Sequence, residues 1–246
     1  MIIASAQNPA IKAIRALAEK KYRQETGLFV AEGEKVLARA RSLGWVPETL
    51  VTIGATEPWG TARVLEVTPD VMAALSAQNN PPPLLAVFSQ KWQDTAHARG
   101  LWLALEEVRD PGNLGTIIRT ADAAGAAGVI LAGQSCDPYG QECVRATMGS
   151  IFAMPLLRLP VTELIGLCRS WPGEIVGTHL LGAEDYRRVY RQPTLLVMGG
   201  EGRGLSPELA AACSLLVRIP MRDGIDSLNL AVASGLMLFE ARRLTE

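Results

Sequence analysis

Cysteine and histidine are scarce in this chain of 246 residues, which contains four cysteines and two histidines. The cysteines form no Cys-x-x-Cys pair, and only His97 and His179 could join them as metal ligands. Zinc sites usually draw their ligands from closely spaced pairs, so we expect no metal site. The simplest interpretation of the cysteines is reduced thiols, and we therefore expect a cytoplasmic protein.

Long apolar runs are also absent. No stretch reaches the ~18 apolar residues that a membrane span needs, because the uncharged segment 71–90 is interrupted by Asn-Asn-Pro-Pro-Pro at 79–83. The first residues turn basic instead of passing from a basic to an apolar stretch, which argues against a secretion signal. We therefore expect no membrane span and no signal peptide.

A strong net charge is missing as well, since the formal charge is −1. The charge is nevertheless uneven, because residues 1–41 contain eight basic and four acidic side chains and thus four excess positive charges. The remainder of the chain then carries a net charge of −5. A basic face of this kind can bind phosphate groups, although solvated helix surfaces would give the same count.

The chain does contain a regular alternation of helix and strand signals. A length of 246 residues with 48% hydrophobic residues allows one large domain or two smaller ones. A polar stretch at 90–100 looks like a linker, so we expect domains at 1–95 and 96–246. In the first domain we expect helices at 9–22, 34–44 and 69–78, and strands at 28–33, 48–54, 62–68 and 83–89.

The second part alternates more clearly. We expect strands at 100–108, 128–133, 153–159, 174–180, 194–200 and 214–221, and helices at 113–125, within 137–149, and at 161–171, 206–213 and 227–243. The strand at 194–200 is continuously apolar, which is typical of strands buried on both faces. The alternation indicates an α/β fold with a mostly parallel sheet and helices on both sides.

Polar or glycine-rich clusters follow three of these strands, where ligands of open α/β sheets bind. The first places Asn113 at the start of a helix and Arg119 six residues later. The second surrounds Glu201 with glycines at 199–204, but fits neither Gly-x-Gly-x-x-Gly nor a P-loop. A tight backbone around a carboxylate suits a hydroxyl-rich or cationic ligand better than a phosphate. A helix cap at Asn113 and an ordinary turn at the glycines are the alternative interpretations.

The third cluster lies at the start of the last expected helix. Asp226 or Ser227 could cap this helix, while Asn229 would lie inside its first turn, where asparagine is unfavourable. The helix is apolar nearly all round and must be covered on more than one side, so we expect a homodimer. One of its apolar faces comprises Leu228, Val232, Leu236 and Phe239.

In this order and at these distances, the clusters resemble the three motifs of the SpoU-type RNA ribose 2′-O-methyltransferases, of the SPOUT superfamily. The similar stretches are VRDPGNLGTIIRTADAAGA, LLVMGGEGRGL and IPMRDGIDSLNLAVASGLMLFEARR, with RATMGSIFAMPLLRL resembling the intervening segment. The match covers essentially all of residues 101–246. Near the N-terminus, NPAIKAIRALAEKKYRQETGLFVAEGEKVLARA resembles the ribosomal-protein-like substrate-binding domain that often precedes this catalytic domain.

The resemblance implies a fold, a cofactor and a reaction. The parallel sheet would end in a C-terminal trefoil knot that binds S-adenosylmethionine largely through backbone groups. A homodimer would transfer the cofactor's methyl group to a ribose 2′-OH of RNA, with ribosomal RNA favoured over transfer RNA by the domain layout. The implied central residues are Asn113, Arg119, Glu201, Ser227 and Asn229, and the implied cofactor-binding residues are Thr178, Gly199, Ile219 and Leu228. RNA phosphates would be contacted by Lys12, Arg15, Lys20, Lys21 and Arg23.

Two other functions remain open at this point. One is a catalytically silent RNA-binding or ribosome-assembly module with the same fold, against which the complete set of central residues argues. The other is a dinucleotide-dependent oxidoreductase on a doubly wound sheet, which the missing Gly-x-Gly-x-x-Gly spacing disfavours.

Overall fold

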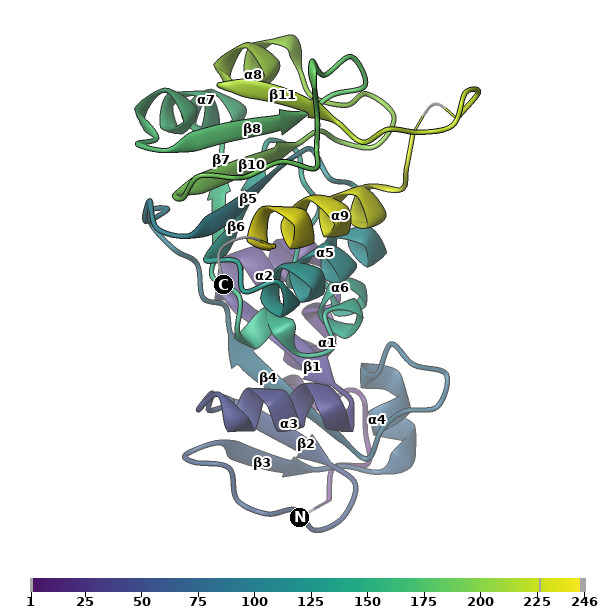
Figure 1. Ribbon diagram of the computed structural model, residues 1–246. Helices are drawn as coiled ribbons and strands as arrows, with labels where there is room; N and C mark the ends of the chain where they lie inside the picture. Colours follow the sequence, from purple (N-terminus) through teal and green to yellow (C-terminus); the bar gives the residue numbers. More distant parts are fainter. Residues whose placement is uncertain (1, 226, 244–246) are drawn as a thin grey trace. The chain divides into compact units, whose positions relative to one another are not determined.

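The computed structural model describes residues 2–225 and 227–243, which form two compact units (Figure 1). The first unit contains the chain up to Gln90 together with Asp137–Ala153. The second contains Lys91–Cys136 and the chain from Met154 onward. The first unit is thus discontinuous in sequence, whereas the expected boundary near residue 95 is a single one. The assignment of separate functions to the two expected domains stays a prediction.

A four-stranded sheet of order β1-β4-β2-β3 forms the first unit. Its elements are α1 (Pro9–Ala16), α2 (Lys20–Thr26), β1 (Leu28–Glu32), α3 (Glu34–Ser42), β2 (Thr49–Thr52), β3 (Arg63–Glu66), α4 (Pro69–Leu75) and β4 (Leu84–Ser89). β2 and β3 are parallel, whereas β4 is antiparallel to β1 and β2. Successive side chains of a strand point to opposite faces. Val30 and Val87 therefore pack with residues of α1 and α4, while Phe29 and Phe88 belong to an aromatic cluster.

The segment Asp137–Ala153 completes that aromatic cluster. It contains α6 (Gln141–Ala146) and the 3₁₀ helix η1 (Ser150–Phe152). The ring of Tyr139 lies 4.7 Å from that of Phe29, and the ring of Phe152 lies 4.8 Å from that of Phe88. Buried aromatic pairs contribute strongly to the stability of a core. The first unit is therefore incomplete without a segment that follows β6 in the sequence.

The single helix expected at 9–22 is wrong, because the chain forms α1 and α2 with a break between them. The buried guanidinium of Arg23 donates to the main-chain oxygens of Leu17 and Ala18 at 2.7 and 2.8 Å. It also pairs with Asp137 at 2.8 Å. Because these carbonyls accept from a side chain, they need no amide from a following helical turn. Arg23 thereby stabilises the break.

The second unit contains a seven-stranded sheet of order β7-β6-β5-β10-β8-β11-β9, whose neighbouring strands are parallel. The strands are β5 (Leu101–Glu106), β6 (Gly128–Ala132), β7 (Leu156–Leu159), β8 (Glu174–Thr178), β9 (Glu184–Asp185), β10 (Thr194–Met198) and β11 (Leu215–Arg218). The predicted α/β class with a mostly parallel sheet is confirmed. The edge strand β9 is too short to produce an alternation of apolar residues, so the sequence does not indicate it.

Helices cover both faces of this sheet (Figure 1). They are α5 (Pro111–Ala123), α7 (Val161–Ser170), α8 (Pro207–Ala212) and α9 (Leu230–Arg242). On one face, Trp102 and Ala104 of β5 pack with Leu164 of α7 and Leu209 of α8. On the other, α5 and α9 pack together, and α9 contacts β5 and β10. The trefoil knot stays a prediction, with which the position of β10 between β5 and β8 is consistent.

Candidate active site

Polar side chains meet at the carboxyl edge of the parallel sheet, although they come from three distant parts of the sequence. Asn113 lies in the first turn of α5, Glu201 follows β10, and Asn229 precedes α9. The Nδ2 of Asn113 donates to Oε1 of Glu201 at 2.6 Å, and the Nδ2 of Asn229 donates to Oδ1 of Asn113 at 3.0 Å. The structure thus brings three of the five implied central residues into one hydrogen-bonded chain.

The backbone of α5 positions Asn113 without using its side chain. Asp110 is the N-cap of α5, and its Oδ1 accepts from the main-chain N of Asn113 at 2.6 Å. The alternative interpretation of Asn113 as the cap of this helix is therefore wrong. Because Asp110 satisfies the free amide of the helix, the amide group of Asn113 can bind to Glu201 and Asn229 instead.

Asn229 is the N-cap of α9, and not a residue of its first turn as expected. Its Oδ1 accepts from the main-chain N of Ala231 at 2.9 Å and of Val232 at 3.2 Å. This arrangement satisfies two free amides of the helix and aims the remaining Nδ2 group at Asn113. Of the two caps expected from the sequence, Ser227 lies before the cap position and Asp226 lies outside the described residues.

The glycine-rich segment Gly199–Ser206, which we call the glycine loop, folds back on itself. The main-chain N of Gly204 donates to the oxygen of Gly200 at 3.1 Å. A Cβ added to Gly199 would lie 1.9 Å from the carbonyl carbon of Gly204, so no larger residue fits there. A backbone this close to its neighbours requires glycine, and it presents Glu201 at an exposed turn.

The other two implied central residues do not join this hydrogen-bonded chain. Arg119 is exposed on α5, about 9 Å along the helix axis from Asn113 at ~1.5 Å per residue. Its guanidinium has no protein partner within residues 2–225 and 227–243. Ser227 is likewise exposed. Both side chains are therefore exposed to solvent.

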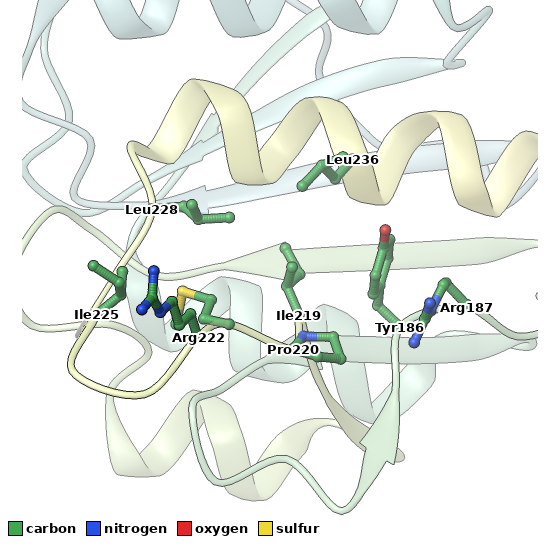
Figure 2. A pocket seen from close by; sticks show the side chains of 9 residues that line it. Tyr186, Arg187, Ile219, Pro220, Arg222, Ile225, Leu228 and Leu236 are labelled. Atoms are coloured by element: carbon green, nitrogen blue, oxygen red, sulfur yellow. The ribbon is translucent and has the colours of Figure 1, made fainter.

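A cavity of about 430 Å³ adjoins this edge, between the segment after β11 and the start of α9 (Figure 2). Its lining residues are Tyr186, Arg187, Ile219, Pro220, Met221, Arg222, Ile225, Leu228 and Leu236. Two of the four implied cofactor-binding residues, Ile219 and Leu228, thus line it. The mostly apolar lining and the volume suit a small-molecule ligand.

The other two implied cofactor-binding residues do not line the cavity. Thr178 is half-buried at the end of β8, where its Oγ1 contacts the sulfur of Met198 at 3.3 Å. Gly199 directly follows β10 and packs against Gly204. Thr178 lies at the carboxyl end of β8 and Gly199 at that of β10, and these two strands are neighbours in the sheet.

One wall of the cavity carries an ion pair. Arg187 donates to both carboxylate oxygens of Asp185, at 2.9 and 2.7 Å. These hydrogen bonds lower the pKa of Asp185 from 3.8 to about 2. Asp185 is therefore charged at neutral pH and offsets the charge of Arg187.

Four of the five implied RNA-binding side chains are exposed in the first unit. These are Lys12 and Arg15 on α1 and Lys20 and Lys21 on α2. Arg23 differs, because its side chain is buried and paired with Asp137. The expectation that Arg23 contacts RNA phosphate is therefore corrected: its guanidinium already has a carboxylate and two carbonyls as partners.

No group of three or more His, Cys, Asp or Glu side chains within residues 2–225 and 227–243 could hold a metal ion. No helix within the same ranges is long and apolar enough to cross a membrane.

Two residues that support the site were not predicted from the sequence. Glu106, the last residue of β5, is buried and accepts from the main-chain N of Ser206 at 2.8 Å. Asp110 caps α5. A carboxylate at the end of an otherwise apolar strand, as in Leu-Trp-Leu-Ala-Leu-Glu, is the signal that could have identified Glu106. The Asp-Pro pair before the helix could have identified Asp110.

The fold and the motif residues at its carboxyl edge define the class of protein. Residues 100–239 match the profile of the SpoU rRNA Methylase family, and residues 8–86 match that of the MRM3-like substrate binding domain. The chain belongs to the SpoU rRNA methylase family, which confirms the resemblance seen in the sequence.

Several relatives span nearly the whole chain. The 23S rRNA (guanosine(2553)-2′-O)-methyltransferase RlmP of Bacillus subtilis is 31% identical, over 98% of this chain and 98% of that protein. The 23S rRNA (uridine(2479)-2′-O)-methyltransferase of Streptomyces viridochromogenes is 34% identical, over 92% of this chain and 86% of that protein.

Solved structures agree with the fold over the full length. The AdoMet-bound rRNA methyltransferase from Sinorhizobium meliloti superimposes with a TM-score of 0.91 at 44% identity, covering 99% of this chain and 97% of that one. The SpoU methyltransferase AviRb from Streptomyces viridochromogenes, in complex with AdoMet, gives a TM-score of 0.84 at 32% identity, covering 97% and 98%.

Proposed function

We propose that this protein is an S-adenosylmethionine-dependent methyltransferase that modifies a ribose 2′-OH of ribosomal RNA. The observation that carries the proposal is the chain of hydrogen bonds from Glu201 through Asn113 to Asn229. It joins residues of all three family motifs at one edge of the sheet, beside a cavity that suits the cofactor. Two relatives of nearly full length carry names that specify 23S rRNA 2′-O-methylation, which favours ribosomal over transfer RNA.

The residues around the cavity fit S-adenosylmethionine. When bound, the cofactor supplies an electrophilic methyl group on its sulfonium sulfur. In the proposal, Ile219 and Leu228 enclose its flat ring and exclude water, while Thr178 and Gly199 bind it from the ends of β8 and β10. Because Gly199 and Gly200 have no side chains, the glycine loop packs tightly against its own backbone and that of Glu106 and Glu107, and this packing fixes the main-chain groups that the loop offers to a ligand.

Asn113 is oriented by its two partners and keeps hydrogen-bonding capacity for a substrate. Its amide nitrogen uses one hydrogen on Glu201, and its amide oxygen uses one lone pair on Asn229. One donor and one acceptor position are left over. We propose that these bind the ribose, and that Glu201 and Asn229 fix which way the amide faces.

Arg119 is proposed to stabilise the charge that develops on the ribose oxygen. A guanidinium keeps its proton at almost any pH, which makes it a poor general base. It can, however, bind a phosphate and an alkoxide through charge-assisted hydrogen bonds. Its exposed position without a protein partner in the described ranges leaves it available for RNA. Ser227 would hold the polar segment before α9.

The proposal gives the remaining parts of the chain separate roles. Residues 1–95 bind RNA, residues 96–246 bind the cofactor and transfer the methyl group, and both act in the cytoplasm. The exposed residues Val232, Leu236 and Phe239 of α9, which we call the α9 stripe, form the interface of a homodimer. The phosphate contacts come from Lys12, Arg15, Lys20 and Lys21.

Two measurements test this proposal. Calorimetry should show binding of S-adenosylmethionine and none of NAD, which the oxidoreductase alternative would need. Tritium should then pass from methyl-labelled cofactor to total RNA from cells that lack this protein. A protein that binds RNA but transfers no tritium would instead be the catalytically silent module.

A further inference from the structure

Glu106 places a carboxylate where β5 is otherwise apolar. All six residues of this strand are buried, and Glu106 itself is 7% exposed. Its Oε2 accepts from the main-chain N of Ser206 at 2.8 Å. Burying a carboxylate costs several kcal/mol unless hydrogen bonds compensate it, so apolar packing alone does not explain this residue.

This hydrogen bond fixes the end of the glycine loop. Ser206 is both the last residue of the loop and the N-cap of α8. Its neighbour Leu205 is buried in the apolar core between the sheet and α7 and α8. The loop therefore ends at a point that is held by one polar and one apolar contact.

The same end of β5 also holds the beginning of the loop. A Cβ added to Gly200 would lie 2.8 Å from the carbonyl oxygen of Glu106 and 3.0 Å from that of Glu107. Gly200 therefore packs directly on the main chain of these residues. Glu106 thus contacts the loop at its start through its backbone and at its end through its side chain.

Glu201 lies between these two fixed points. We infer that Glu106 is a positioning residue for methyl transfer: it holds the glycine loop so that the carboxylate of Glu201 stays on Asn113. The inference rests on the proposed function. Glu106 is not among the residues that line the cavity, and it acts through the hydrogen bond to Ser206.

The hydrogen bond between Ser206 and Glu106 can be removed by replacing either its acceptor or its donor. Glu106→Ala removes the acceptor, while Glu106→Gln keeps an oxygen that can accept. Ser206→Pro removes the donor, and the φ of −60° at Ser206 already suits proline. It also removes the hydroxyl that caps α8, so Ser206→Ala, which loses the hydroxyl but keeps the donor, is its matched control. Ser214→Ala is the control for stability, because it removes two hydrogen bonds to Ile175 at the opposite edge of the sheet.

The first readout needs no substrate. Hydrogen–deuterium exchange of the amides at 199–205 should be slow in the wild type, Glu106→Gln and Ser214→Ala proteins. It should be at least tenfold faster in Glu106→Ala and Ser206→Pro, measured well below their melting temperatures. Unchanged exchange in both of these variants would overturn the inference.

The second readout is the methyl-transfer rate at saturating S-adenosylmethionine, with total RNA from cells lacking this protein as acceptor. We expect kcat to fall by about 10- to 100-fold in Glu106→Ala and Ser206→Pro. Glu106→Gln should restore most of it, and Ser214→Ala should keep it. Equal losses in Glu106→Gln and Glu106→Ala, or normal kcat in Glu106→Ala, would contradict the positioning role. If the wild type transferred nothing, the proposed function would fail, and exchange alone would decide whether Glu106 holds the loop.

Discussion

Asn229 performs two tasks that substitutions can separate. Its oxygen caps α9, and its nitrogen donates to Asn113. Aspartate can replace the cap but cannot donate, whereas alanine can do neither. We therefore expect Asn229→Asp to keep the wild-type melting temperature within a few degrees and to lower methyl transfer about tenfold or more.

The matched variant is Asn229→Ala, which should lose about 1 kcal/mol of unfolding free energy in addition to its activity. Calorimetric unfolding and tritium transfer on the same samples separate the two effects. An Asn229→Asp protein with full activity would show that the bond to Asn113 does not contribute to the reaction.

At the residue scale, the sequence names the central residues but not their contacts. Asn113 is 88 positions from Glu201 and 116 from Asn229, so neither contact follows from local spacing. The resemblance supplies the identities, and the parallel sheet supplies the meeting point. The caps differ from those expected because Asp110, Asn113, Ser227 and Asn229 are all good cap residues, and only the helix boundaries decide between them.

The α9 stripe is the element that bears on the oligomeric state. Val232 and Phe239 are 54% and 52% exposed, although apolar residues at this spacing usually face a core. We expect the wild type to sediment as a dimer at micromolar concentration. The double variant Val232→Glu/Phe239→Glu should sediment as a folded monomer, because a dimer would have to bury the new carboxylates in its interface.

An exposed position on α7 provides the control for that experiment. Thr162→Glu adds a carboxylate to the same unit outside the stripe and should leave the dimer intact. A wild-type protein that sediments as a monomer at these concentrations would refute the interface on α9.

Two thiols, those of Cys168 of α7 and Cys213 after α8, make the stability of the second unit depend on alkaline pH. Burial raises the pKa of Cys168 from 9.0 to about 11 and that of Cys213 to about 12. An unfolded thiol loses its proton near pH 9, before the folded one does. The contribution of the two thiols to the free energy of unfolding is therefore complete below pH 9. It is lost as the pH rises towards 11 and 12.

The free energy of unfolding should fall between pH 9 and 11 because the unfolded thiols lose their protons in this range. We expect this loss to be smaller in Cys168→Ala/Cys213→Ala than in the wild type, by on the order of 2 kcal/mol. Denaturant titrations at the two pH values measure it, and Cys136→Ala, which leaves both thiols in place, is the control. Equal losses in the wild type and the double variant would show that these thiols do not cause the alkaline sensitivity.

At the element scale, apolar periodicity predicts most strands and helices close to their positions. It fails at 9–22, where propensity favours one helix and the buried Arg23 favours a break. It also cannot assign the segment 137–153 to the first unit, because that depends on the aromatic contacts of Tyr139 and Phe152. In both places a tertiary contact overrides the local signal.

For the whole molecule, we expect the salt dependence of RNA binding to come from exposed basic side chains of α1 and α2. Replacing Lys12, Arg15, Lys20 and Lys21 by alanine should weaken RNA binding and reduce the slope of log K against log salt by up to about one per lost phosphate contact. Binding of S-adenosylmethionine should not change. The control is Arg169→Ala, which removes an exposed charge from α7. An unaltered salt slope in the fourfold variant would place the RNA contacts elsewhere.

We expect the whole protein to transfer a methyl group to a ribose 2′-OH of RNA. The most direct measurement is mass spectrometry of nucleosides after incubation of unmodified ribosomal RNA with the protein and S-adenosylmethionine. We expect one 2′-O-methylated nucleoside with the wild type and none with Arg119→Ala, and calorimetry should show that this variant still binds the cofactor. A methylated base, or normal 2′-O-methylation by Arg119→Ala, would contradict this expectation.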